Sequence, residues 1–481
     1  MCSRVGINSL RASNGGLSHA FAEQQAMETL KNKLCEAENP ETNILALLTD
    51  SFKTHDAEPS PSAFSFVIKY LFRKRSLSCI PPVLHHLESA ERFEVPEGIL
   101  ANVIRAYGRA ELLEDAADVF YRIPRFRCVP SARSLNTLLS FLCRKREGLG
   151  LVRDVLMKSL DMGIRLDAST FRILIGALCR NGKARYAKEM FYVMLQLDEL
   201  APDGGMYSMV LYYLCKQPGS SGEAMDFLKE MQNVGFSPKL SEYNSVIDAL
   251  VRDGKANNAY SVLAHMRVEG GRPDITSYNS VLDGFVAANE FLKADRLFDE
   301  ILLMGLVPDT CTYNTYIDGL CKEGNLERAC RMVSCMEKAG CKPDSSTFNV
   351  LISGYSKAGD MGRAKEFMDE MLEKGFHWNS HTYESVISGL FQKGEIMAGR
   401  KLLVEMLGKG YVPQASTFNS CICCMCKNDH VHEAVQVLDE MTKHSISPDA
   451  MSWEALLAGC RLNPFSIPIN LEAVTSMSLA A

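Results

Sequence analysis

Apolar residues recur along this chain at the spacing of helices that bury one face. Within residues 310–344, one apolar stripe runs from Tyr313 to Cys321 at positions i, i+3, i+4, i+7 and i+8, and a second runs from Leu326 to Met336. This spacing predicts two amphipathic helices. A glycine separates the stripes, and a glycine followed three residues later by a proline ends the second, as is usual at helix ends. The segment is therefore predicted to fold as helix, turn, helix and loop.

The same pattern returns at a constant step of 35 residues. A fixed period of this size indicates one supersecondary unit that is repeated and stacked. Neither stripe can be buried within one hairpin, so adjacent hairpins must pack together, and the pattern leaves the hand of the resulting superhelix open. The aromatic residue that opens each first stripe marks the period at Tyr243, Tyr278, Tyr313, Phe348, Tyr383 and Phe418.

The repeats are regular in the second half of the chain and looser before it. Both sets have the same two stripes, but three of the looser units carry one extra residue. The clean units are 240–274, 275–309, 310–344, 345–379, 380–414 and 415–449. The looser units are 97–131, 132–167, 168–203 and 204–239.

The repeat array as a whole is predicted to span residues 97–462. A degenerate helical cap is expected at 41–96 and an irregular tail at 463–481. Residues 1–40 are interpreted as a transit peptide or a disordered N-terminus. The first 22 residues contain no acid, two arginines and several serines, a composition that suits both interpretations.

The composition is that of an ordinary soluble protein, with 47% hydrophobic and 23% charged residues. No apolar run reaches the roughly 18 residues of a membrane span, so no transmembrane segment is expected. The net charge of −6 gives no overall basic signal for nucleic acid. A local basic stripe would matter more for such binding than the sum.

The sequence indicates no cofactor and no metal site. The 17 cysteines form no disulfide framework, and several share one repeat position, which suggests reduced core residues. Cysteines and histidines crowd residues 421–432, but they lie on a predicted helix rather than on paired metal-binding turns, so core packing is favoured over a zinc site. One methionine of each second stripe is read as core: Met266, Met336, Met371, Met406 and Met441.

Two strings identify a related family. Residues 312–329 read TYNTYIDGLCKEGNLERA, and residues 347–364 read TFNVLISGYSKAGDMGRA. Both closely resemble the pentatricopeptide repeat family, and the 35-residue units resemble its P-type subclass. The resemblance implies an all-α fold, a right-handed α-solenoid of about ten stacked antiparallel helix hairpins. It also implies one nucleotide of single-stranded RNA bound per repeat, in a plant organelle.

In this family the base is read by the fifth residue of a unit together with the last. An asparagine amide offers a donor and an acceptor in one plane, and a nearby aspartate can fix its orientation. By this analogy, uridine is predicted opposite Asn136 with Asp167, Asn244 with Asp274, Asn279 with Asp309, Asn314 with Asp344, and Asn419 with Asp449. Cytidine, then uridine, is predicted opposite Asn349 with Asn379. No base is assigned to Ala101 with Ser131, Arg172 with Asp203, Ser208 with Lys239, or Glu384 with Gln414.

With the polarity that the resemblance implies, the expected target is 5′-N-U-N-N-U-U-U-Y-N-U-3′. The alternative is structural, because asparagine often caps a helix and aspartate after proline is common in turns. The repetition of the pair in register favours base reading. The resemblance also implies a valine at the second position of each unit, but this chain has Ser241, Thr276, Cys311, Ser346, His381 and Ser416, which predicts weaker stacking on the bases.

A basic residue recurs at the thirteenth position. It would favour the helix dipole at the end of each first helix, and one cation per unit would also form a ladder for phosphates, which is the role that the resemblance implies. The members are Arg109, Arg144, Arg180, Lys216, Arg252, Lys322, Lys357 and Lys427.

The sequence thus favours a non-enzymatic, RNA-binding protein of an organelle, with the mitochondrion ahead of the chloroplast. Its partners would be single-stranded RNA and other RNA-processing proteins, and its role RNA stabilisation, processing, splicing or translation. The alternative is a scaffold that binds proteins in the same groove. No phosphate loop, nucleophile elbow or pair of catalytic carboxylates is recognisable.

Overall fold

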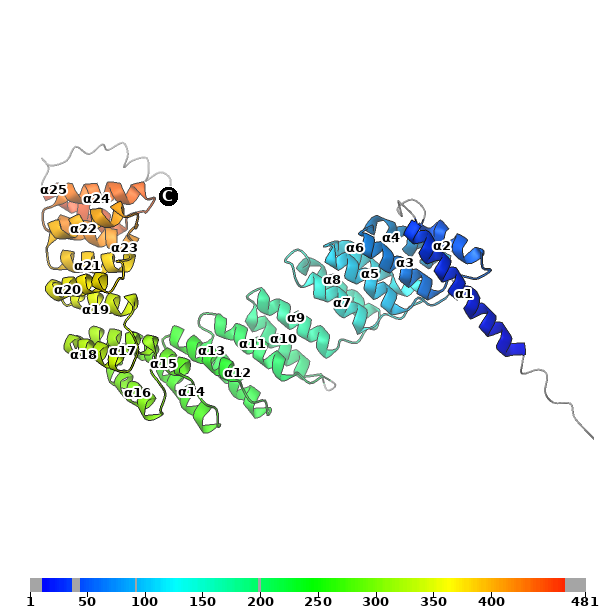
Figure 1. Cartoon of the computed structure of the whole chain (residues 1–481), viewed down its shortest axis with the longest axis horizontal. Helices are drawn as coiled ribbons and strands as arrows, with labels where there is room; N and C mark the ends of the chain where they lie inside the picture. The colour runs from blue at the N-terminus through cyan, green and yellow to red at the C-terminus, as the bar shows by residue number, and fades with distance from the viewer. Residues whose placement is uncertain (1–10, 37–43, 91–92, 198–199, 463–481) are drawn as a thin grey trace, which may run out of the picture. The chain divides into compact units, whose positions relative to one another are not determined.

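The computed structural model describes residues 11–36, 44–90, 93–197 and 200–462, and every regular element in these ranges is a helix. The prediction of an all-α protein built from stacked hairpins is confirmed. The chain divides into two compact units, Met1–Gln217 and Pro218–Ala481, within which hairpin follows hairpin (Figure 1). The tail predicted at 463–481 lies outside the described residues.

The first unit begins with two helices that the repeat pattern does not include, followed by the cap hairpin and the looser repeats. Two short 3-10 turns, η1 and η2, adjoin second helices. The elements are α1 (Arg11–Glu36), α2 (Ile44–Lys53), α3 (Pro61–Lys74), η1 (Leu77–Cys79), α4 (Ile80–Ser89), α5 (Glu97–Arg109), α6 (Leu113–Arg122), η2 (Ile123–Phe126), α7 (Ala132–Leu142), α8 (Leu149–Asp161), α9 (Ala168–Arg180), α10 (Ala184–Leu195) and α11 (Gly204–Lys216).

Helix α1 differs from the sequence-based expectation. Residues 1–40 were expected to be a transit peptide or disordered, but Ala26, Leu30 and Leu34 are fully buried or nearly so. They recur every four residues and therefore share one helix face. The hydroxyl of Tyr70 on α3 donates to the backbone oxygen of Leu34 over 2.6 Å. The expectation of disorder is therefore wrong for this part of the segment, because its apolar face packs on the cap; a transit peptide stays a prediction.

The second unit contains the clean repeats. Each first helix except the last is followed by its second helix, and the final element described is a first helix. The elements are α12 (Ser221–Asn233), α13 (Leu240–Arg252), α14 (Ala256–Val268), α15 (Ile275–Ala287), α16 (Phe291–Leu303), α17 (Thr310–Glu323), α18 (Leu326–Lys338), α19 (Ser345–Lys357), α20 (Met361–Glu373), α21 (Ser380–Gln392), α22 (Ile396–Gly408), α23 (Ala415–Lys427), α24 (Val431–Lys443) and α25 (Ala450–Leu462).

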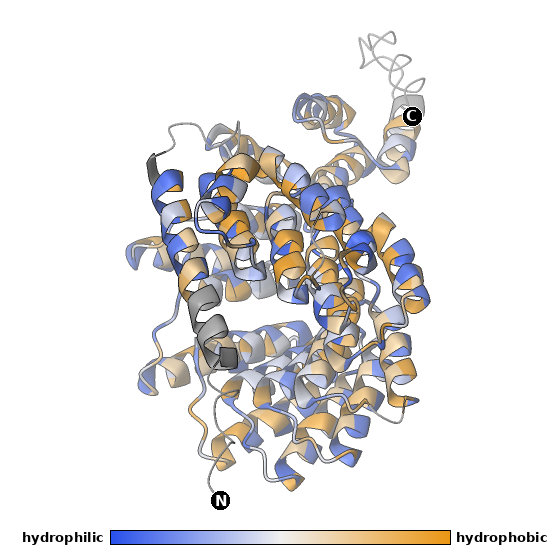
Figure 2. Cartoon of the chain, turned by 90° about the vertical axis from the view of Figure 1, so that its right-hand side faces the viewer, coloured by the Kyte–Doolittle hydropathy of each residue, from blue (hydrophilic) through white to orange (hydrophobic). Residues whose placement is uncertain are grey.

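The aromatic residue at the fourth position fills the core between neighbouring hairpins. Tyr278 is 1% exposed, and its hydroxyl contacts Arg267 of the preceding hairpin and Glu300 of its own. The five methionines read as core, one in each of five second helices, are buried as predicted. Individual helices carry hydrophobic and hydrophilic residues together, as Figure 2 shows. The hydrophobic face of each hairpin is therefore covered by its neighbours.

Four glycines let successive first helices pack closely. A Cβ atom built on Gly354 in α19 would lie 2.7 Å from Sγ of Cys321 in α17. Real Cβ atoms do not approach so closely, so the packing depends on the missing side chain. The first helices thereby form one continuous layer, α13–α15–α17–α19–α21, in the second unit. The other glycines with such close neighbours in this layer are Gly284, Gly319 and Gly389.

Candidate nucleic-acid interface

The candidate base-reading asparagines lie inside the first helices rather than at their caps. Asn279 is the fifth residue of α15, and the N-cap of that helix is Asp274. The interpretation of the asparagine as a cap is therefore wrong, whereas the aspartate is a cap. Asp309, which pairs with Asn279, accepts the backbone N–H of Thr312 over 2.8 Å and so caps α17 of the next hairpin.

The same aspartates also hold the asparagines. In α15, Nδ2 of Asn279 donates to Oδ1 of Asp309 across the junction between two hairpins. One carboxylate oxygen thus satisfies the start of one hairpin and fixes an amide on the first helix of the hairpin before it. The Nδ2–Oδ1 distances are 2.9 Å for Asn136–Asp167, 3.5 Å for Asn244–Asp274, 3.1 Å for Asn279–Asp309 and 3.2 Å for Asn314–Asp344.

A hydroxyl at the third position of the next repeat completes this arrangement. Thr312 donates to Oδ1 of Asn279 over 2.7 Å and accepts the backbone N–H of Asp309 over 3.2 Å. The amide therefore has its oxygen against a hydroxyl and its nitrogen against a carboxylate, which fixes its orientation. One N–H and one oxygen lone pair of the amide remain for a ligand. Equivalent hydroxyls on the other asparagines belong to Thr170, Ser277, Thr347, Thr382 and Ser452.

The repeat pattern alone does not point to these hydroxyls. They were visible as a serine or threonine before most of the repeat aromatics, but their partners lie 33 or 34 residues away. All those equivalent to Thr312 are buried: Thr170, Ser277, Thr347, Thr382 and Ser452. A buried hydroxyl needs a partner, and the asparagine oxygen is that partner.

Four aspartates of the pairs, Asp167, Asp274, Asp309 and Asp344, have lowered pKa values and are ionised at neutral pH. Burial alone would raise the pKa of Asp309, but hydrogen bonds from the backbone and hydroxyl of Thr312 and from the amide of Asn279 outweigh it and lower the pKa. The pKa values of Asp167, Asp274 and Asp344 are lowered by hydrogen bonds of the same kind, again against an opposing effect of burial. The carboxylate is therefore a permanent acceptor at neutral pH.

The Asn349–Asn379 pair is built differently. Asn379 caps α21 through the backbone N–H of Thr382 at 3.0 Å, and Thr382 donates to Oδ1 of Asn349 over 2.6 Å. No hydrogen bond joins the two asparagine side chains in the described structure. Asn349 is also only 7% exposed, so it offers less surface to a ligand than the half-buried Asn279.

At positions to which no base is assigned, the side chains form other contacts. Arg172 forms an ion pair with Asp203, which also caps α11. Glu384 accepts the backbone N–H of Gln414 over 2.7 Å. Ser208 donates to the backbone oxygen of Gly204, within its own helix.

The last pair, Asn419 on α23 with Asp449, forms only part of this hydrogen-bond arrangement. Asp449 accepts the backbone N–H of Ser452 over 2.8 Å, and Ser452 donates to Asn419 over 3.0 Å. The direct bond from amide to carboxylate is not formed here. Four of the five Asn–Asp pairs are thus joined by a direct hydrogen bond, but base reading itself stays a prediction.

The cations of the thirteenth position are all exposed, and most are the last residue of a first helix. Arg144 lies just beyond the end of α7, with its guanidinium 5.0 Å from the ring centre of Phe141. Lys322 forms an ion pair with Asp318 over 2.8 Å. Their exposure fits both the helix-dipole and the phosphate interpretations. The exposed members are Arg109, Arg144, Arg180, Lys216, Arg252, Lys322, Lys357 and Lys427.

A hollow in the first unit is lined by both a candidate base-reading asparagine and candidate phosphate-binding cations. It has a volume of about 420 Å³ and is lined by Asn136 on α7, by Arg105 and Arg109 on α5, and by Arg144. A base-reading candidate and three cations therefore share one surface, which is the combination that a nucleotide with its phosphate requires.

The charge of the first helices differs between the two units. Helices α3, α5, α7, α9 and α11 carry nine lysines and arginines, and their only acid is Glu97. In the second unit, Asp248, Asp283 and Asp318 each follow a reading asparagine by four residues and share its helix face. The cationic surface is therefore concentrated in the first unit.

The cysteine-rich run lies on α23 and in the turn that follows. Cys421 and Cys426 are buried, whereas Cys423 and Cys424 are half-buried. Burial raises the pKa of Cys421, which disfavours the thiolate that a metal needs. No group of three or more metal-binding side chains comes together among the described residues.

Two related family models match this chain. The model described as the PPR repeat family matches residues 241–286, 273–322, 308–356, 343–392 and 413–461. The model described as the PPR repeat matches residues 102–128, 169–198 and 381–411. Together these matches cover more than half of the sequence.

The curated relatives are named as pentatricopeptide repeat-containing proteins. A mitochondrial pentatricopeptide repeat-containing protein of Arabidopsis thaliana is 43% identical over 235 residues, 48% of this chain and 51% of that protein. Another protein with this description in Arabidopsis thaliana is 24% identical over 139 residues, 29% of this chain and 34% of that protein. The chain thus matches about half, or less, of the length of these relatives.

Among solved structures, the maize pentatricopeptide repeat protein PPR10 is 20% identical, with a TM-score of 0.44. The match covers 95% of this chain and 78% of the maize chain. Within the described ranges, none of the helices combines the length and the apolar character needed to cross a bilayer.

Proposed function

Because the chain belongs to the pentatricopeptide repeat family, we propose that it binds single-stranded RNA sequence-specifically, with one base opposite each hairpin. Repeats of this family read one base each through two or three side chains. The proposal rests on one observation: amides from successive hairpins are held in the same orientation by a carboxylate and a hydroxyl of the next hairpin. An amide fixed in this way presents a constant donor and acceptor to a base edge.

The two units would contribute differently. The cations of the first unit would attract the backbone, because phosphate contacts supply most of the sequence-independent affinity. The second unit holds four of the five Asn–Asp pairs and would supply most of the base discrimination. The aspartates beside its reading asparagines would weaken its own hold on phosphates.

The proposed target is the pyrimidine-rich ten-mer 5′-N-U-N-N-U-U-U-Y-N-U-3′. The test is fluorescence anisotropy with the labelled RNA 5′-AUAAUUUCAU-3′ and with a control in which the uridines at positions 5 to 7 are replaced by adenosines. We expect the control to bind at least about 10-fold more weakly, since each lost base contact costs about 1 kcal/mol or more. Equal affinity for both RNAs would contradict base reading.

A variant separates base reading from backbone binding. Asn279→Ala removes one amide but no charge, so it should lower discrimination at position 6 and leave affinity for the adenosine control unchanged. If neither RNA binds to the purified protein, the alternative of a protein-binding scaffold gains support.

We further assign the chain to the P-type subclass and to the mitochondrion. The constant 35-residue length of the clean units supports the first assignment, and the name of the 43% identical relative supports the second over the chloroplast. The chain would act by binding rather than by catalysis, in RNA stabilisation, processing, splicing or translation. Imaging of a fluorescent fusion with mitochondrial and plastid markers tests the location.

A further inference from the structure

Four cations meet between the cap hairpin and the first repeat, outside the predicted base-reading positions. Lys69 and Arg75 approach from the α3 side, and Arg105 and Arg109 from α5. Together with Phe72 they line a cavity of about 810 Å³, and none of the described residues that line it is acidic. Its size is within the usual range for sites that hold a nucleotide-sized ligand.

Among the described residues, no carboxylate neutralises these cations. None of the four forms an ion pair with a described carboxylate, and Arg105 has a neutral partner, the side-chain oxygen of Asn102 at 2.8 Å. Four like charges around one hollow repel each other and create a positive potential, which a bound anion would relieve. Arg105 is the best oriented of the four, because the asparagine fixes one end of its guanidinium.

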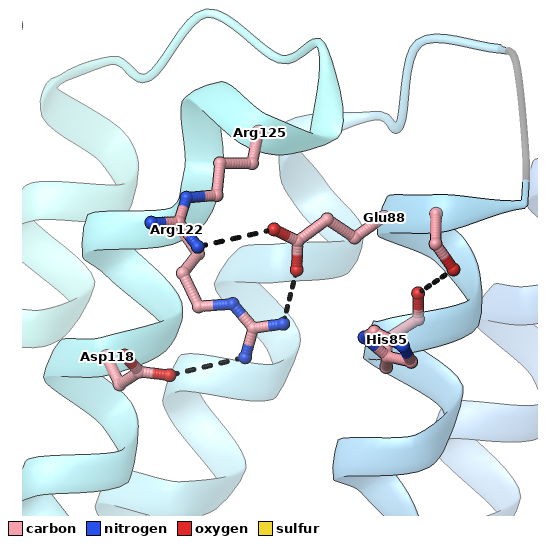
Figure 3. Close-up of polar contacts among 6 residues, drawn as sticks. His85, Glu88, Asp118, Arg122 and Arg125 are labelled. Carbon is pink, nitrogen blue, oxygen red and sulfur yellow. Dashed lines mark hydrogen bonds and ion pairs between the residues drawn. The ribbon is translucent and has the colours of Figure 1, made fainter.

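The second helices of the same hairpins show the opposite arrangement. Arg122 on α6 lies between Glu88 on α4, at 2.5 Å, and Asp118, at 3.3 Å, and Arg125 lies 3.5 Å from Glu88 (Figure 3). There, each arginine has a carboxylate partner and ties two hairpins together. Among the described residues, the cavity cations on the first-helix side therefore lack carboxylate partners, whereas the arginines on the second-helix side have them.

The cavity adjoins the candidate interface through two shared residues. Arg105 and Arg109 line both this cavity and the smaller hollow that contains Asn136. A strand whose base lies at Asn136 could therefore continue past these two arginines toward Lys69 and Arg75. Phosphates along an extended strand would meet the four cations in succession.

On the basis of the proposed function, we propose that this cavity binds backbone phosphate of the RNA where the strand passes beyond the first repeat. The cap hairpin then adds affinity without reading a base. The recognised group is a phosphate, either an internal diester or the terminal monoester of the RNA.

The test compares the ten-mer 5′-AUAAUUUCAU-3′ with forms that carry three abasic nucleotides at the 5′ end or at the 3′ end, or a single 5′-phosphate. Abasic nucleotides add phosphates without bases. We expect the 5′ extension, which lies on the side of the first repeat in the proposed polarity, to tighten binding on the order of 5-fold and to steepen the salt dependence by about 0.7 per phosphate bound. An equal gain from the 5′-phosphate alone would identify the terminal monoester as the ligand.

Variants test whether the gain in RNA affinity comes from the cavity. The double variant Lys69→Gln, Arg75→Gly removes two of its cations, and glycine suits position 75 because the backbone there has φ of 60°. The variant should bind the unextended ten-mer normally and lose the gain from the extension. The matched control is Arg73→Gln, an exposed cation of α3 that does not line the cavity; it should retain the gain.

Three outcomes overturn the inference. The extensions add nothing to wild-type affinity, the gain persists in the double variant, or the gain is lost equally in the Arg73→Gln control. If the wild-type protein binds none of the RNAs, both the proposed function and the inference about the cavity fail. Normal binding of the ten-mer without a gain from extension would refute the cavity alone.

Discussion

The hydroxyl oxygen of Thr312 lies 2.7 Å from Oδ1 of Asn279, although the two residues belong to successive hairpins. The contact fixes which end of the amide faces the next repeat. It therefore links the packing of two hairpins to the orientation of a group that is proposed to read a base.

Thr312→Val removes the hydroxyl but keeps the shape of the side chain. The oxygen of Asn279 and the N–H of Asp309 each lose a partner, so the free energy of unfolding should fall by about 1–2 kcal/mol. Discrimination of uridine at position 6 of the target should fall, while position 7, opposite Asn314, should not change. Urea unfolding and anisotropy with single-base RNA variants measure the two effects. An equal loss at both positions would show a general disturbance instead.

Asp309→Asn should change base preference with little effect on stability. Asparagine caps a helix about as well as aspartate, so α17 should remain intact. The permanent acceptor for the amide of Asn279 is lost, and the pair becomes like Asn349–Asn379. We expect the preference at position 6 to move from uridine toward cytidine. Asp309→Ala is the control, since it also removes the cap and should lower stability by about 1 kcal/mol.

Gly354→Ala should destabilise the second unit. The new Cβ atom would lie 2.7 Å from Sγ of Cys321, so α17 and α19 would have to move apart, with an expected loss of about 1–3 kcal/mol. Gly362→Ala on α20 is the matched control, because its Cβ atom would meet nothing closer than 3.5 Å. That variant should be neutral or slightly stabilised, by up to about 1 kcal/mol. Thermal unfolding followed by circular dichroism distinguishes the two.

Acid should weaken the junctions between hairpins. The pKa values of Asp167, Asp274, Asp309 and Asp344 are lower in the folded protein than the ordinary value of about 3.9. Their stabilising effect is therefore complete above that value and is lost as the pH falls through the lower, folded-state values. Urea unfolding at pH 7, 4 and 3 should show a decrease that begins near pH 4. The decrease should be smaller in Asp309→Asn, and an unchanged slope in that variant would contradict the assignment.

Arg144→Gln should reduce the salt dependence of RNA binding. If Arg144 contacts one phosphate, the slope of log K against log salt should become shallower by about 0.7. Arg125→Gln removes a cation on the second-helix side, next to Glu88, and should leave the slope unchanged. Titrations between low and moderate salt with the same ten-mer give both slopes.

The helix boundaries could be predicted from sequence because local chemistry sets them. Gly324 ends α17 with a φ of 89°, which glycine adopts without strain, and Asp309 caps the start of the same helix. Both signals lie within a few residues of the helix ends that they define. The hairpins and their period can therefore be predicted from the sequence alone.

The contacts between hairpins could not be predicted in this way. Thr312 and Asn279 are 33 residues apart, and only the packing of α15 on α17 makes them neighbours. The same applies to the cavity at Lys69 and Arg105, which come from the cap and the first repeat. The burial of α1 was missed because that helix lies outside the repeating pattern.

The contact of each reading amide with a hydroxyl of the next repeat unit affects how the array can change in length. If one clean 35-residue unit is deleted, the asparagine before the gap keeps the aspartate of its own unit and meets an equivalent hydroxyl after the gap, so the arrangement forms again. The shortened protein would recognise an RNA one base shorter, and every junction that remained would still be intact. Gain or loss of whole units would thus alter the target in single-nucleotide steps.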